Sequence, residues 1–192
     1  MNNYFIGDWY ADSAIMNEYL KGVYLTTGND RQANKFFIKK GKAESAKMGL
    51  TWRKLIGKEV REIDEKTGLY KTKLLAENPE LMDVFREYAN LYFPMLQWSE
   101  ITINYSPTGT IIKQHRDKVN VGDSALVAFG DYTGGLTYVE NNHDHNFTLT
   151  DCRDELLIFN GNSLKHGVTA VTSGERYSVV FYKNKYKIKS EN

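Results

Sequence analysis

Thr110-Ile-Ile-Lys-Gln-His115-Arg116-Asp117 begins a segment that ends with Arg176-Tyr-Ser-Val-Val-Phe-Tyr182, and this segment sets the architecture. Asp117 follows His115 by two residues, so on an extended chain both side chains point to the same side. His166 comes 49 residues after Asp117, which is enough chain for several antiparallel strands to bring a third ligand into place. Two imidazoles and one carboxylate on one face of an ion form the ligand set of non-haem Fe(II) oxygenases. We therefore interpret His115, Asp117 and His166 as Fe(II) ligands and as the catalytic centre, with open positions on the metal for a co-substrate and O2.

The last strand-like stretch carries a charged residue on its inner face. Alternation along residues 176–182 places Arg176, Ser178 and Val180 on one side. An inward Arg needs an anion, and the remote carboxylate of 2-oxoglutarate would supply one, held by a bidentate pair with the Ser178 hydroxyl as a further donor. Tyr105, on the strand before the metal pair, is either a core residue or a hydrogen-bond donor to this co-substrate.

Three further motifs accompany these residues. They read His115-Arg116-Asp117-Lys118-Val119-Asn120, Gly130-Asp131-Tyr132-Thr133-Gly134-Gly135, and His166-Gly167-Val168-Thr169. With the spacing of the ligands and the Arg, they resemble the Fe(II)/2-oxoglutarate dioxygenases of the double-stranded β-helix class, over residues 101–182. Within that superfamily the chain is most similar to TET/JBP-type enzymes, which oxidise the 5-methyl group of pyrimidines in nucleic acid. Asn120 carries the subfamily likeness.

The resemblance implies a substrate as well as a fold. The implied target is the methyl group of thymine or 5-methylcytosine in DNA, either flipped out of a duplex or in a single strand, because stacking hides it from a buried metal. Asn120 would contact the base edge, beside Arg116. A simple loop cap is the alternative for Asn120.

A basic segment precedes this centre. From Arg31 to Lys58 there are nine Lys or Arg residues against one acid, Glu44, with aromatic residues between them. Cations with aromatic surfaces suit a phosphate backbone and unstacked bases. A solvated face with the aromatic residues turned inward is the alternative. The predicted DNA contacts in this segment are Lys39, Lys40, Trp52, Arg53 and Lys54.

Composition predicts one compact domain. The 192 residues are 41% hydrophobic, carry a net charge of +1 and include one cysteine, Cys152, which suits a reducing cytoplasm. No apolar run approaches the roughly 20 residues that cross a bilayer. We expect a soluble, cytoplasmic monomer with no membrane partner.

The predicted fold is mainly β (α+β), a double-stranded β-helix or jelly roll with supporting helices. Residues 1–98 form a helical, substrate-side region, and residues 99–183 form the β-helix core. Asp12 is expected to cap a helix over 13–20, and Asn78-Pro79 to start a helix with an apolar stripe. Strands are expected at 101–105, 110–114, 125–129, 136–139, 146–149, 155–159, 166–171 and 176–182.

Other interpretations remain at this level. The iron centre fits equally a hydroxylase of a protein side chain, amino acid or metabolite, and the scaffold fits a non-catalytic nucleic-acid-binding module. An AlkB-type demethylase is disfavoured because Tyr182 stands where those enzymes carry another Arg. His143-Asp144-His145 is interpreted as an exposed hairpin tip, and Cys152 as an ordinary residue near a turn.

Overall fold

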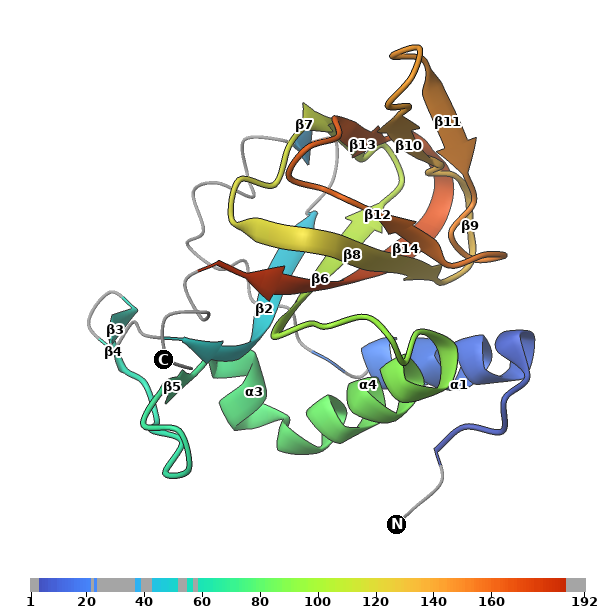
Figure 1. The fold of residues 1–192 in the computed structure, drawn as a ribbon. Helices are drawn as coiled ribbons and strands as arrows, with labels where there is room; N and C mark the ends of the chain where they lie inside the picture. Colours follow the sequence, from blue (N-terminus) through green and yellow to red (C-terminus); the bar gives the residue numbers. More distant parts are fainter. Residues whose placement is uncertain are drawn as a thin grey trace.

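Two antiparallel sheets face each other above a layer of helices (Figure 1). A computed structural model describes residues 4–21, 23, 37–38, 43–51, 55–56 and 59–185. The larger sheet has the order β12-β8-β14-β6-β2-β5, with β9 paired to β14, and the smaller has the order β1-β7-β13-β10-β11. The larger sheet contains β2 (Glu44–Thr51), β5 (Tyr70–Lys71), β6 (Glu100–Pro107), β8 (Asn120–Phe129), β9 (Tyr132–Gly134), β12 (Leu157–Phe159) and β14 (Val171–Asn184). The smaller contains β1 (Phe37–Ile38), β7 (Ile111–His115), β10 (Thr137–Glu140), β11 (Phe147–Thr150) and β13 (His166–Val168), while β3 (Leu55–Ile56) pairs only with β4 (Glu59–Val60).

Strand β8 of the larger sheet is apolar on both faces over residues 125–129, because both faces are covered there. In β8, Ala125, Val127 and Phe129 belong to the core on the helical side, whereas Leu126 and Ala128 belong to the smaller core between the sheets. Successive side chains of a strand point to opposite faces, so this continuous apolar run fills two cores at once.

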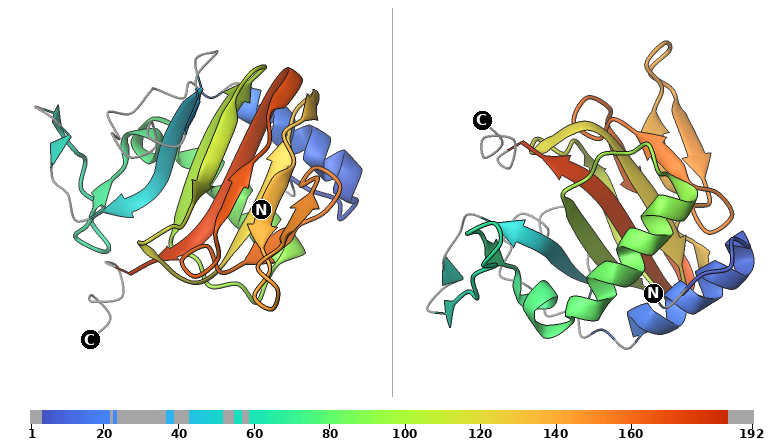
Figure 2. Two further views of the ribbon diagram at one scale, coloured as in Figure 1. Left: turned by 90° about the horizontal axis from the view of Figure 1, so that it is seen from above. Right: turned by 60° about the horizontal axis from the view of Figure 1, so that its bottom comes forward.

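The helices that the structure describes cover the larger sheet: α1 (Trp9–Lys21), α3 (Lys73–Glu77) and α4 (Pro79–Tyr92). Figure 2 shows α4 lying across the strands with α1 beside it. Phe85 of α4 meets Phe181 of β14 edge to face, with ring centroids 5.8 Å apart. Burial of each such side chain stabilises the fold by roughly 1.5–3 kcal/mol, so the helices anchor the back of the sheet that carries the site. No helix among the described residues has the length and apolarity to cross a membrane.

The predicted fold class is confirmed, and each of the eight predicted strands has a counterpart, β14 being several residues longer. The capping residues of the helices differ from prediction. Asp12 does not cap; it is buried inside α1, where its carboxylate accepts bonds from the Ile6 and Gly7 N–H groups. α4 begins at Pro79 as expected, but the Asn78 side chain donates back to the carbonyl of Leu74.

Strand β2 lies in the first predicted region, before residue 98, but it pairs with a strand of the second region. It pairs with β6 from Glu44 opposite Tyr105 to Gly49 opposite Glu100, so a strand from the first half of the chain extends the main sheet. Its sequence includes Lys47 and Gly49, which weaken any apolar alternation. The strand forms because β6 offers an edge that β2 can pair with.

Candidate metal and co-substrate site

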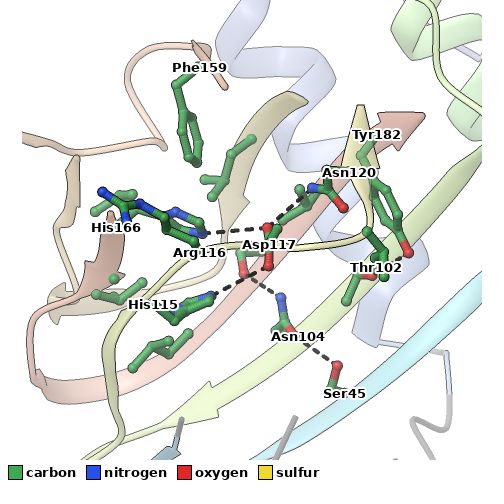
Figure 3. Close-up of a pocket in the computed structure, with 18 of the residues that line it drawn as sticks. Ser45, Thr102, Asn104, His115, Arg116, Asp117, Asn120, Phe159, His166 and Tyr182 are labelled. Atoms are coloured by element: carbon green, nitrogen blue, oxygen red, sulfur yellow. Dashed lines mark hydrogen bonds and ion pairs between the residues drawn. The ribbon is translucent and has the colours of Figure 1, made fainter. Parts of the chain in front are cut away.

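The two histidines meet because their strands are neighbours. His115 ends β7, His166 begins β13, and the antiparallel register places their Cα atoms opposite each other. Their ring centroids are 4.3 Å apart. Asp117 lies two residues beyond β7, and one potential ligand atom from each of the three residues lies within 4.8 Å of the others (Figure 3). The structure thus brings together the three predicted ligands.

Backbone carbonyls orient both imidazole rings. Nδ1 of His115 lies 2.8 Å from the carbonyl oxygen of Lys113, and Nδ1 of His166 lies 3.0 Å from that of Leu164. A carbonyl only accepts, so Nδ1 carries the hydrogen in each neutral ring, leaving Nε2 with a lone pair. The Nε2 atoms of His115 and His166 lie 3.7 Å and 3.5 Å from oxygens of Asp117. Both lone pairs therefore face the carboxylate.

The electrostatics favour the ligand forms of these residues. Burial and the neighbouring His166 lower the pKa of His115, which keeps its ring neutral near pH 7. Burial alone would raise the pKa of Asp117, but the neighbouring His166 and His115 outweigh it and lower this pKa. A neutral imidazole and an ionised carboxylate are the forms that bind a metal.

A cavity of about 400 Å³ opens beside the three residues, between the two sheets. Its floor is a polar row: the Ser45 hydroxyl donates to Oδ1 of Asn104 at 2.8 Å, and Nδ2 of Asn104 donates to Oγ of Ser178 at 3.3 Å. Because Ser178 accepts the Asn104 bond, its own hydroxyl hydrogen is left to donate. Apolar walls come from residues including Leu126, Phe159, Val168 and Val180.

Arg176 is fully buried, shares the inward face of β14 with the cavity residue Ser178, and is under-satisfied. Its Nη2 donates to Oγ1 of Thr137, which lines the cavity, at 3.2 Å. Its Nε and Nη1 have no hydrogen-bond partner among the described residues. A buried cation with unpaired donors is costly, and a carboxylate accepting from the planar guanidinium would remove that cost. The buried guanidinium of Arg176 therefore fits an anionic co-substrate, and the two His and one Asp fit Fe(II).

Of the two alternatives for Tyr105, the structure agrees with the core residue and not with the co-substrate donor. Its hydroxyl donates to Glu175 at 2.6 Å and its ring packs against Tyr177, on the helical side of β6. Strand alternation explains this position, because Tyr105 shares a face with Ile101 and Ile103. The inward neighbour is Asn104.

Among the cavity residues that the sequence did not predict are Asn104 and Thr137. Asn104 could have been found by applying the alternation strictly to β6. Thr137 carries no local signal, because its contact with Arg176 joins β10 to β14 across 39 positions. Thr137 can be recognised as a cavity residue only once the two sheets are seen to face each other.

The remaining predicted residues divide into two groups. Arg116 and Asn120 line the cavity; Arg116 pairs with Glu140 at 3.3 Å. Lys39, Lys40, Trp52, Arg53 and Lys54 lie outside the described residues. The His143-Asp144-His145 segment is an exposed turn between β10 and β11, as predicted, and Cys152 is buried beside Thr137.

The chain has the double-stranded β-helix fold that is found in solved structures of 2-oxoglutarate/Fe(II) oxygenases. A prolyl hydroxylase in complex with a hypoxia inducible factor peptide fragment, from Trichoplax adhaerens, superposes with a TM-score of 0.53 at 13% identity, covering 100% of this chain and 86% of that one. The structure of NgTET1 in complex with 5mC DNA superposes with a TM-score of 0.51 at 17% identity, covering 94% and 76%.

One curated protein is also similar in sequence over part of the chain. The chain is 33% identical over 75 residues to Tet-like dioxygenase 1 of Naegleria gruberi, which is 39% of this chain and 23% of that protein. It therefore spans under a quarter of that relative's length. No protein-family model matches the chain. The predicted resemblance to TET-like oxygenases is confirmed as a resemblance.

Proposed function

We propose that this protein is an Fe(II)- and 2-oxoglutarate-dependent dioxygenase. One observation carries the proposal: two histidines and an aspartate converge within 4.8 Å beside a cavity, and Thr137 of that cavity accepts from Arg176, a buried guanidinium with two unpaired nitrogens among the described residues. A metal and an anionic co-substrate account for both features.

Each side chain has a defined task in this proposal. His115 and His166 would hold Fe(II) through Nε2, with Asp117 as the anionic ligand. Arg176 and Ser178 would hold the remote carboxylate of 2-oxoglutarate. Phe159, whose ring centroid lies 4.9 Å from that of His166, keeps water from one side of the metal site. The bound metal and co-substrate would supply the oxidation of a C–H bond by O2.

The proposed substrate is the 5-methyl group of thymine or 5-methylcytosine in DNA. Support comes from the similarity to the Tet-like dioxygenase and from charge. Three cations line the cavity, Lys47, Arg116 and Lys118, whereas the metal ligand Asp117 is the sole acid among the described lining residues. Such a mouth attracts a phosphate backbone.

Asn120 would recognise the base through its side-chain carbonyl oxygen alone. Its amide nitrogen already donates to Asp117 and Ser124. It can therefore offer only its carbonyl oxygen, which suits the N–H donors on the polar edges of thymine and 5-methylcytosine. Because the site lies between two sheets, the base must leave the stack to reach it.

The dioxygenase proposal is tested by co-substrate turnover. Purified protein with Fe(II), O2 and 2-oxoglutarate is expected to release succinate, and Asp117→Ala should abolish release because the anionic ligand is lost. Glu155→Gln, an exposed acid outside the cavity, is the control. Equal succinate from Asp117→Ala and the wild type would contradict the assigned centre, and no succinate from any form would favour the non-catalytic binding module.

The substrate proposal is tested on DNA itself. Methylated DNA is incubated with the active protein and digested, and the masses of its nucleosides are measured by mass spectrometry. A gain of one oxygen on thymidine or 5-methyldeoxycytidine is expected. Neutralising Lys39, Lys40, Arg53 and Lys54 should weaken salt-dependent DNA binding. Unchanged nucleosides despite succinate release would favour a protein side chain, amino acid or metabolite as substrate.

A further inference from the structure

Each of the three candidate ligands has an outer hydrogen-bond partner. The histidines use backbone carbonyls, at Lys113 and Leu164. Asp117 uses a side chain: Nδ2 of Asn120 lies 3.2 Å from its Oδ2. An aspartate needs such a partner more than a histidine on a strand does, because Asp117 lies in a loop and its carboxylate torsion is intrinsically broad.

The orientation of the Asn120 amide is forced by its partners. A carboxylate only accepts hydrogen bonds, so the nitrogen end must face Asp117. The same nitrogen lies 3.2 Å from Oγ of Ser124, a residue of β8 that is 1% exposed. The amide thus links the carboxylate to the main sheet.

The backbone of Asn120 is fixed as well. Its N–H donates to the carbonyl of Asp117 at 3.1 Å, and its own carbonyl accepts from Nδ2 of Asn162 at 3.0 Å. The Asp117 N–H donates to the carbonyl of Gly161 at 2.8 Å. The loop that carries the carboxylate is therefore tied to the turn that precedes His166.

Gly161 closes the arrangement from the other side. A Cβ at this position would lie 3.2 Å from Oδ2 of Asp117, 3.5 Å from Cε1 of His166 and 3.6 Å from Nδ2 of Asn120. Any larger residue would press on the carboxylate. The turn backbone and the Asn120 amide thus flank the same oxygen.

From this geometry we infer that Asn120, anchored by Ser124 and backed by Gly161, is a positioning residue that sets the direction of the metal-binding carboxylate. The inference rests on the proposed function, since it needs a metal between Asp117 and the histidines. It gives Asn120 a task that precedes any contact with substrate. Loss of an outer partner of a metal ligand typically costs about 10- to 100-fold in metal affinity.

Metal binding without co-substrate or DNA tests the inference. Metal-free protein is titrated with Co(II) under argon, and the visible absorption bands report both the dissociation constant and the ligand geometry. Asn120→Ala is expected to raise the Co(II) dissociation constant about 10- to 100-fold and to change the band shape. Ser124→Ala and Gly161→Ala should act in the same direction, the first by freeing the amide and the second by displacing Oδ2.

The matched control is Asn104→Ala, which removes the other cavity asparagine, bonded to Ser45 and Ser178 and to no metal ligand. Its Co(II) affinity should equal that of the wild type. Thermal unfolding of the metal-free variants identifies any general loss of folding. Wild-type affinity in both Asn120→Ala and Ser124→Ala would overturn the inference alone, whereas a wild-type chain that binds no Co(II) would overturn the proposed function with it.

Discussion

At the scale of single residues, the unusual feature is a buried cation that is only partly satisfied. Nη2 of Arg176 donates to Thr137, whereas its Nε and Nη1 have no hydrogen-bond partner among the described residues. The ring of Tyr132 is near both Arg176 and a second arginine: the guanidinium carbon of Arg176 is 5.8 Å from the ring centroid, and that of Arg153 is 4.1 Å. Arg153 is satisfied by Asp151, at 2.7 Å. Among the described residues, Arg153 is paired with a protein carboxylate and Arg176 is not.

This difference makes a direct prediction. Arg176→Met should raise the KM for 2-oxoglutarate by roughly 30-fold or more, because truncating one partner of a buried charge pair costs about 2–5 kcal/mol. Arg153→Met is the matched control and should leave this KM unchanged. Succinate formation at varied 2-oxoglutarate measures both. An equal rise in the two variants would mean that the effect is structural.

At the scale of elements, β13 is the strand whose packing decides the metal geometry. It lies between β7 and β10 and carries His166 at its start. A Cβ at Gly167 would collide with the Tyr138 hydroxyl and would lie 2.6 Å from the carbonyl oxygen of Ile112. The absence of a side chain here lets Tyr138 cross the strand and donate to that carbonyl.

Gly167→Ala is therefore expected to destabilise the protein by about 1–3 kcal/mol through overpacking, and to weaken metal binding by shifting His166. Urea unfolding measures the first effect and Co(II) titration the second. Gly68→Ala, in an open turn at φ +68 with nothing within 4 Å, is the comparison. It should cost only the roughly 1–2 kcal/mol of a left-handed residue and leave Co(II) binding intact.

At the scale of the whole molecule, Glu140 joins separate segments around the mouth of the site. This carboxylate is 5% exposed. It accepts from the Lys165 N–H and ammonium, at 3.2 and 3.1 Å, and lies 3.3 Å from Arg116 and 3.5 Å from His145. The Lys165 backbone and side-chain bonds lower the pKa of Glu140 from 4.5 to about 2.

A lowered carboxyl pKa has a definite sign for stability. The folded state binds the proton less readily than the unfolded state, so this contribution is full above pH 4.5 and is lost as the pH falls from 4.5 towards 2. Urea midpoints measured across this range should fall more steeply for the wild type than for Glu140→Gln. Glu155→Gln, in an exposed turn, should follow the wild type. Parallel curves for wild type and Glu140→Gln would contradict the role of this cluster.

Local patterns in the sequence determined the strands of the β-helix, the inward face of β14 and the identity of the three residues that meet at its edge. These features depend on spacings of two residues along a strand, which every extended chain obeys. The sequence left Tyr105 open between a core residue and a co-substrate donor, and strand alternation places it in the core with Ile101 and Ile103 on the helical side.

Only the tertiary structure decided which strands are neighbours and what lies across the cavity. The pairing of β2 with β6, the bond from Arg176 to Thr137, and the link from Ser124 through Asn120 to Asp117 all join elements by their final positions. Such contacts form because burying apolar surface brings the sheets together, and polar side chains then bond whichever partner faces them. The sequence names the ligands, and the packing of the sheets holds them in place.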